Sequence, residues 1–153
     1  MIIVTALSLI ALSVSSEPSP WNINCSEPEA EETPECTVQQ EIIMKNSQLP
    51  VLQLTFARLN KKEPPHALLI VPLGIYLPGK VTIQIDAEPA KSFPVERCDP
   101  DGCHLFMGLT SPTLERLLSG ELLTVSFLDS DRVKIQIPVA LSGFKEAYQT
   151  LAR

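Results

Sequence analysis

Apolar and polar residues alternate in several short segments of this chain, and this period of two constrains the fold more than any other feature. Successive side chains of a β-strand point to opposite sides, so alternation is typical of strands that bury one face. Alternating or continuously apolar segments predict seven strands: Thr37–Met44, Leu52–Phe56, His66–Leu73, Val81–Asp86, Cys103–Leu109, Leu122–Leu128 and Val133–Val139.

The segments between the predicted strands carry turn-forming residues, as in Leu77–Gly79, Asp99–Gly102 and Asp129–Asp131. His66–Leu73 is the most continuously apolar segment, which predicts a central strand covered on both faces, with Pro72 at its end or edge. Seven short strands with frequent turns predict an antiparallel β-sandwich.

Two segments have helical rather than strand periodicity. Ser111 and Pro112 are typical of a helix start, and the leucine stripe that follows ends at Gly120. In Phe144–Leu151, apolar residues recur at helical spacing, which predicts a helix packed on the sandwich, with partner binding as the alternative. The expected fold is therefore mainly β with one or two short helices.

The first sixteen residues are typical of a secretory signal peptide. An apolar run from Ile2 to Leu12 precedes Val14 and Ser16, which occupy the minus-three and minus-one positions of a cleavage site. A membrane span is the alternative, but the run is shorter than the ~20 residues that a bilayer requires. We therefore expect a signal peptide over 1–16, no integral membrane span, and a single domain over 17–153. Within that domain, Glu17–Glu35 is expected to be loosely ordered.

Export predicts that the four cysteines form disulfides. Cys98 and Cys103 flank a turn-forming tetrapeptide, so a hairpin would place them opposite each other. Cys25 and Cys36 enclose ten residues rich in Glu and Pro. Chain entropy alone favours a crossed pairing, but the turn geometry favours two local disulfides, Cys25–Cys36 and Cys98–Cys103.

Two metal sites are the alternatives to this pairing. Cys98, Cys103 and His104 include zinc-ligand residue types, but no second pair with matching spacing occurs in the chain. The segment Asp99–Gly102 has a faint likeness to a calcium loop, but the downstream glutamate of such a loop is missing. The sequence therefore predicts no metal and no cofactor.

Charge excludes some partners. The net charge is −6, and seven acidic residues precede the first basic residue, Lys45, so the rest of the chain is nearly neutral. This balance argues against nucleic acid, and against an anionic membrane surface, because both require clustered Lys and Arg.

Catalytic motifs are almost absent. Only His66 and His104 could act as a general base near neutral pH without a shifted pKa, and neither lies in a nucleophile motif. The sequence therefore predicts that the protein is not an enzyme, unless a site is assembled from distant positions. The single tryptophan, Trp21, is the candidate interaction residue, with burial against the sandwich as the alternative.

An ordered set of sequence blocks resembles the invasion associated locus B family of Gram-negative bacterial exported proteins. The blocks are Trp21–Cys25, Cys36–Gln40, Val51–Gln53, Val71–Gly79, Ile85–Asp86, Cys98–Cys103, Leu118–Gly120 and Pro138–Phe144. The resemblance implies an immunoglobulin-like β-sandwich that is periplasmic, outer-membrane associated or secreted, and in pathogens a link to entry into host cells. It implies no catalytic residues.

Two functional hypotheses follow. The first is an exported, non-enzymatic interaction protein with a protein partner on the cell envelope or the host surface. The alternative is a periplasmic module that binds a small ligand or an envelope component. An exposed apolar patch favours the first hypothesis, and a deep, mostly apolar pocket favours the second.

Overall fold

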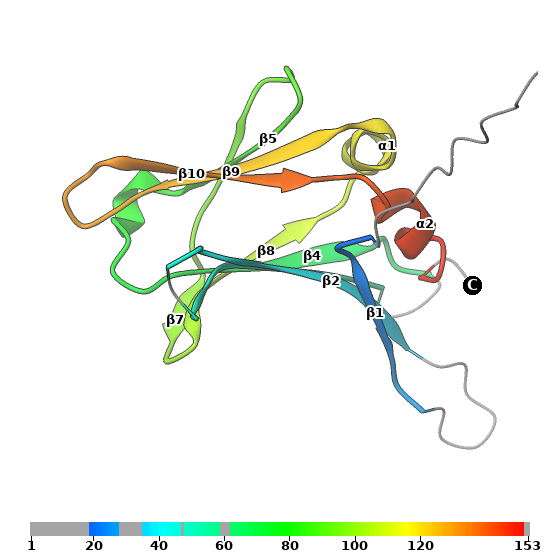
Figure 1. Ribbon diagram of the computed structural model, residues 1–153. Coiled ribbons are helices and arrows are strands. Elements are labelled where there is room, and N and C mark those ends of the chain that lie inside the picture. Colours follow the sequence, from blue (N-terminus) through cyan, green and yellow to red (C-terminus); the bar gives the residue numbers. More distant parts are fainter. Residues whose placement is uncertain (1–18, 28–34, 47, 59–61, 152–153) are drawn as a thin grey trace, which may run out of the picture.

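Two antiparallel sheets lie face to face in the computed structural model, with the two α-helices at one end (Figure 1). The structure describes residues 19–27, 35–46, 48–58 and 62–151. The predicted signal peptide, 1–16, lies outside these ranges.

The larger sheet has six strands and the smaller has four. The order in the larger sheet is β1 (Asn22–Cys25), β2 (Cys36–Ile43), β3 (Pro50–Ala57), β4 (His66–Val71), β8 (Gly102–Gly108) and β7 (Arg97–Asp99). The order in the smaller sheet is β10 (Lys134–Ala140), β9 (Leu122–Leu128), β5 (Val81–Ile85) and β6 (Lys91–Phe93). All pairs of neighbouring strands are antiparallel. The prediction of a mainly β, antiparallel fold is confirmed.

The core lies between the sheets and is built from alternate residues of each strand, as period two predicts. On β3 the inward residues Leu52, Leu54 and Phe56 are at most 1% exposed, while their neighbours are half-buried. Burying large aliphatic and aromatic side chains from both sheets supplies the main favourable free energy of such a fold.

The prediction for β4 was half wrong. The strand is central, since it pairs with β3 on one side and β8 on the other. It is not covered on both faces, because Leu68 and Ile70 on its outer face are only partly buried. The continuous apolar run therefore supplies one core face and one half-exposed face. Pro72 follows the last residue of the strand, as expected.

Both predicted helices are present. α1 (Ser111–Ser119) begins one residue earlier than expected, with Thr110 as its N-cap and Gly120 as its C-cap. α2 (Phe144–Tyr148) is shorter than predicted, and the chain continues in turns to Leu151. The apolar face predicted for this segment is buried, which confirms core packing. A short 3₁₀ helix, η1 (Leu77–Gly79), links β4 to β5.

Three strands were not predicted. β6 and β7 have three residues each, too few to show a period. β1 lies inside Glu17–Glu35, which was expected to be loosely ordered, and its pairing with β2 corrects that expectation for Asn22–Cys25. Residues 28–34 of the same segment lie outside the described ranges.

Candidate functional site

The β7–β8 hairpin brings together one histidine and two aspartates, which are side chains that can bind a metal or take part in proton transfer. Its strands pair in register, with Cys98 opposite Cys103 and Asp99 opposite Gly102. The two cysteines form a disulfide with their Cα atoms 3.9 Å apart. This cross-strand link fixes the turn that carries Asp99 and Asp101.

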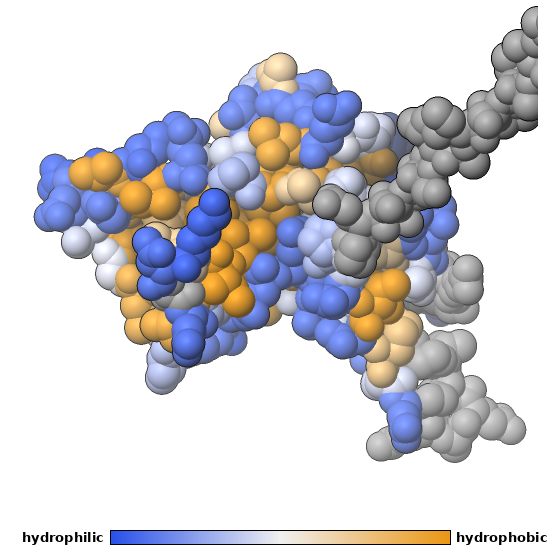
Figure 2. Space-filling view, viewed as in Figure 1, coloured by the Kyte–Doolittle hydropathy of each residue, from blue (hydrophilic) through white to orange (hydrophobic). Residues whose placement is uncertain are grey.

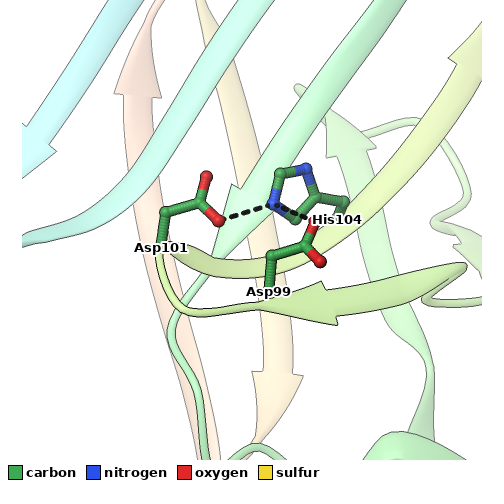
Figure 3. A group of neighbouring side chains, drawn as sticks. All are labelled: Asp99, Asp101 and His104. Carbon is green, nitrogen blue, oxygen red and sulfur yellow. Dashed lines mark hydrogen bonds and ion pairs between the residues drawn. The ribbon is translucent and has the colours of Figure 1, made fainter.

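His104 is the centre of a small polar cluster. Its side chain is only 6% exposed, and its Nε2 lies 3.1 Å from Oδ1 of Asp101 and 3.6 Å from Oδ2 of Asp99. Both carboxylates point toward the same ring nitrogen (Figure 3). Arg97 donates a hydrogen bond of 2.7 Å from Nε to Asp99 Oδ2. Each carboxylate therefore already has a cationic or hydrogen-bonding partner.

The electrostatics follow from this arrangement. The hydrogen bond from His104 holds the pKa of the Asp101 carboxyl below its usual range, while desolvation acts in the opposite direction. The hydrogen bond stabilises the ionised form of Asp101, because a charged carboxylate accepts a hydrogen bond more strongly than a protonated carboxyl group does.

The cluster has ligand types that metals use. Nε2 of His104 and one oxygen from each of Asp99 and Asp101 lie within 4.8 Å of one another. However, the Asp99 carboxylate already accepts a hydrogen bond from Arg97, and Nδ1 of His104 is buried without a hydrogen-bond partner in the described residues. Histidines that bind metals usually donate their second ring N–H to an acceptor. The arrangement fits a hydrogen-bonded clamp on the hairpin better than a metal centre.

The zinc set considered from the sequence does not assemble. Cys98 and Cys103 are joined to each other, so neither offers a thiolate beside His104. The second histidine, His66, lies opposite Gly108, whereas His104 lies opposite Ile70, four residues further along β4. The structure therefore does not bring the two histidines together.

The second disulfide joins Cys25 to Cys36, with Cα atoms 4.0 Å apart. These residues are directly opposed on β1 and β2, so this link is also cross-strand. The prediction of two local disulfides is confirmed. All four cysteines are paired in this way.

Trp21 lies in the core. It is 4% exposed, and its ring centroid lies 5.7 Å from that of Phe56 and 4.8 Å from that of Phe144. Tyr148 extends the cluster, 5.7 Å from Phe144. The structure therefore corrects the interaction hypothesis for Trp21, because a ring buried against α2 offers no surface to a partner. Its role is to anchor the chain just before β1.

The residues that sequence analysis missed are exposed aliphatic side chains in loops. Leu73 and Leu77 are 55% and 48% exposed. Leu73 was predicted to end a strand and Leu77 to begin a turn, but β4 ends at Val71, so both lie in the connection that follows it. The signal was present, since leucines beside Pro and Gly in a connection have no strand or helix face to bury them. Within the described ranges, no helix has the length and apolar character needed to cross a bilayer.

These features define a class of protein: a two-sheet antiparallel β-sandwich in which two disulfides link opposed residues of neighbouring strands. The family model described as Invasion associated locus B (IalB) protein matches residues 21–152, and the chain belongs to this family. The resemblance of the sequence blocks is thereby confirmed.

A solved structure supports the same fold. The crystal structure of invasion associated protein b from Bartonella henselae superimposes with a TM-score of 0.75 and 22% sequence identity. The match covers 91% of this chain and 95% of that one. A comparison with curated proteins finds no match.

Proposed function

We propose that the chain is an exported, non-enzymatic interaction protein of the Gram-negative envelope. It is synthesised with a signal peptide over 1–16 and works in the periplasm, at the outer membrane or outside the cell as a single domain. The observation that carries this proposal is the pair of cross-strand disulfides, since such bonds persist in oxidising compartments. Family membership supports it.

The geometry of the polar cluster supports the non-enzymatic part of the proposal. His104 is hydrogen-bonded to Asp101, and no hydroxyl or thiol group in the described residues is hydrogen-bonded to its ring. A general base needs a nucleophile or substrate proton within reach. The cluster instead ties the β7–β8 turn together.

The name of the Bartonella henselae relative suggests the biological setting. That protein is described as invasion associated. We propose that this chain likewise acts through a surface that contacts a partner on the envelope or on a host cell. A domain fixed by two disulfides is suited to presenting loops in constant positions.

Processing is tested by the intact mass of the native protein and by thiol alkylation without reduction. The proposal predicts an N-terminus at Glu17 or within a few residues of it, and no alkylated cysteine. Retention of residues 1–16 in a membrane fraction, or free thiols in the native protein, would contradict export as proposed.

A second candidate function, binding of a small polar ligand or envelope component, is favoured by one surface feature. A hollow of about 380 Å³ runs over β1, β2 and β3 and is lined mainly by polar residues. Asn24, Gln39 and Gln53 are among them. In contrast, the mostly apolar pocket beside α1 has a volume of about 20 Å³, room for one water molecule.

This candidate is tested by adding peptidoglycan fragments to the protein in solution and measuring the change in its Tm. Binding at the hollow predicts a rise in Tm that Gln53→Ala removes. An unchanged Tm, or a rise that Gln53→Ala leaves intact, excludes this site and leaves the interaction function.

A further inference from the structure

Exposed apolar side chains are concentrated at one end of the sandwich. Nine large apolar side chains in the described residues are exposed, and six of them lie in or beside loops of that end, each between 48% and 73% exposed. We call this set the apolar loop end. Its members are Ile43, Met44, Leu49, Leu73, Leu77 and Val133.

Strand register places these loops together. Gln53 near the start of β3 pairs with Ile70 near the end of β4, so the β2–β3 and β4–β5 connections share one end. The amide of Tyr76 donates a 2.8 Å hydrogen bond to the carbonyl of Leu128, which joins the β4–β5 connection to the end of β9. The turn that follows β9 lies at this end, opposite α2 (Figure 1).

The surface view agrees with this grouping. Figure 2 shows apolar surface around these loops and along the adjoining side of the sandwich, interrupted by hydrophilic tips. The loops are separate projections rather than the walls of a deep pocket. The side chains that they expose are aliphatic and thioether groups, with no exposed Trp or Phe among them.

Four cations flank the apolar residues. Lys45, Lys80, Arg132 and Lys134 are exposed, and none of them forms an ion pair in the described part of the chain. The guanidinium of Arg132 lies over the ring of Tyr76, 4.8 Å from its centroid. Tyrosine is enriched where membrane proteins meet the lipid headgroup layer, and basic residues near that layer are attracted to anionic headgroups.

The acids at this end are Asp129 and Asp131 on the turn after β9, and Asp99 and Asp101 on the β7–β8 hairpin. The carboxylate of Asp129 accepts the amides of Asp131 and Val133, at 2.9 and 2.8 Å. Asp99 and Asp101 are held by Arg97 and His104. The three loops that carry the apolar side chains therefore hold four cations against two carboxylates, Asp129 and Asp131, and this excess of positive charge favours an anionic surface even though the whole chain carries a net charge of −6. Whole-chain charge averages over acids that lie elsewhere, seven of them before Lys45.

We propose that the apolar loop end docks the exported protein on an anionic lipid bilayer. Aliphatic side chains on separate loop tips suit a fluid acyl layer, which adapts to an uneven surface, whereas protein interfaces favour flat patches rich in Trp and Tyr. The flanking lysines and arginine then meet the anionic headgroups. This inference rests on the proposed export, and it names the surface that the interaction uses.

Vesicle sedimentation tests the proposal with the processed protein purified after export. The probe is phosphatidylcholine vesicles containing about one third phosphatidylglycerol, at low salt. We expect binding that weakens as salt rises and a loss of about tenfold or more for Leu73→Ser with Leu77→Ser. The matched control is Ile23→Ser with Leu122→Ser, which removes two leucine or isoleucine side chains of similar exposure, 44% and 42%, outside the apolar loop end.

The charge contribution has its own pair of variants. Replacing both Lys45 and Lys80 by Gln should weaken binding by about fivefold for each lysine removed. The control replaces Lys91 and Lys145 by Gln, which changes net charge equally away from the apolar loop end. Measured at about 0.1 M salt, where the Debye length is about 10 Å, the control should bind within about twofold of the original protein, because charges farther than this from the bilayer are screened.

Two results would overturn the proposal. Absence of vesicle binding by the original protein excludes a lipid partner, and equal losses in the loop and control variants exclude this surface. If the loop variants instead abolish a concentration-dependent dimer seen by sedimentation velocity, with no vesicle binding, the occupant is a second copy of the chain. None of these results bears on processing or thiol state, so export is judged separately.

Discussion

Gly102 is the residue on which the geometry of the β7–β8 hairpin most depends. Its φ is +145°, and an added Cβ would lie 2.6 Å from Cγ2 of Ile70 and 2.7 Å from the carbonyl oxygen of Val71. Only glycine adopts this backbone region readily, and only glycine fits so close to the neighbouring strand. The positions of Asp101 and His104 therefore depend on Gly102 and on the disulfide of Cys103.

Replacing Gly102 by Ala should lower the free energy of unfolding by about 3 kcal/mol, since both the backbone and β4 must adjust. Gly108→Ala is the matched control, because Gly108 lies on the same strand with open space around its Cα and no positive φ. Urea denaturation of both variants measures the difference. Equal losses in the two variants would show that the close approach at position 102 is unimportant.

Asp101 should make stability depend on acid pH. Its pKa is lowered in the folded protein, chiefly by the His104 hydrogen bond, so it contributes stability above the unfolded-state value of about 4. That contribution is lost as pH falls from about 4 through the lower folded-state pKa. Asp101→Asn should therefore give a flatter curve of Tm against pH in this acid range.

The control for this measurement is Asp131→Asn. Asp131 is an exposed turn residue whose carboxylate makes no hydrogen bond or ion pair in the part of the chain that the structure describes. Its replacement should leave the acid slope unchanged. An Asp101→Asn protein with the same acid slope as the original would contradict a stabilising bond to His104.

At the scale of elements, β1 shows how a strand without an apolar face is kept in a sheet. All four of its residues are exposed. It is held at one end by Trp21, buried against Phe56, and at the other by the Cys25–Cys36 disulfide. Strand pairing alone contributes little at an exposed edge, so these two anchors determine its position.

Replacing Cys25 and Cys36 by Ala should therefore release β1 while the rest of the sandwich remains folded. Chain entropy predicts a loss of about 3 kcal/mol. Amide hydrogen exchange should accelerate in β1 but not in β9, which is central in the other sheet. Unchanged exchange in β1 would mean that Trp21 and backbone pairing suffice to hold it.

Asp86, the residue after β5, ties the end of that strand to the start of β9. It has a φ of 48°, and its Oδ1 accepts the amides of Glu121 and Leu122 at 3.1 and 2.9 Å. Asp86→Ala should cost about 1–2 kcal/mol in unfolding free energy, because it leaves those amides without an acceptor. Asp86→Asn keeps a carbonyl acceptor and should recover part of the loss in thermal unfolding. A loss equal to that of Ala would indicate that the charge, rather than the acceptor, matters.

How far the elements could be predicted depends on what held each one in place. Strands such as β3 and β9, which bury one face, were predicted because burial imposes period two on the sequence. β1, β6 and β7 were missed because a disulfide, a short edge pairing and a hairpin turn hold them, and none of these leaves a period. Val133 was assigned to a strand, but it lies in the preceding turn and is 56% exposed.

For the whole molecule, the sequence indicated the fold and the disulfides but not the surface that we propose to be functional. In the sequence, Leu73 ends an apolar segment and Leu77 begins a turn, and only strand register places their loop beside the turns that follow β2 and β9. The contact of Asp101 with His104 is local and could be anticipated from the hairpin. Grouping of distant loops depends on topology, which a single sequence does not state.

The central claim is that this molecule acts through a surface and that its histidine cluster supports structure only. Complementation of a strain that lacks the gene tests this claim most directly, with folded and exported variants compared side by side. We predict that His104→Gln with Asp101→Asn restores the phenotype, whereas Leu73→Ser with Leu77→Ser does not. Failure of the first variant together with full restoration by the second, at equal protein levels, would contradict the account and point to chemistry at the polar side chains.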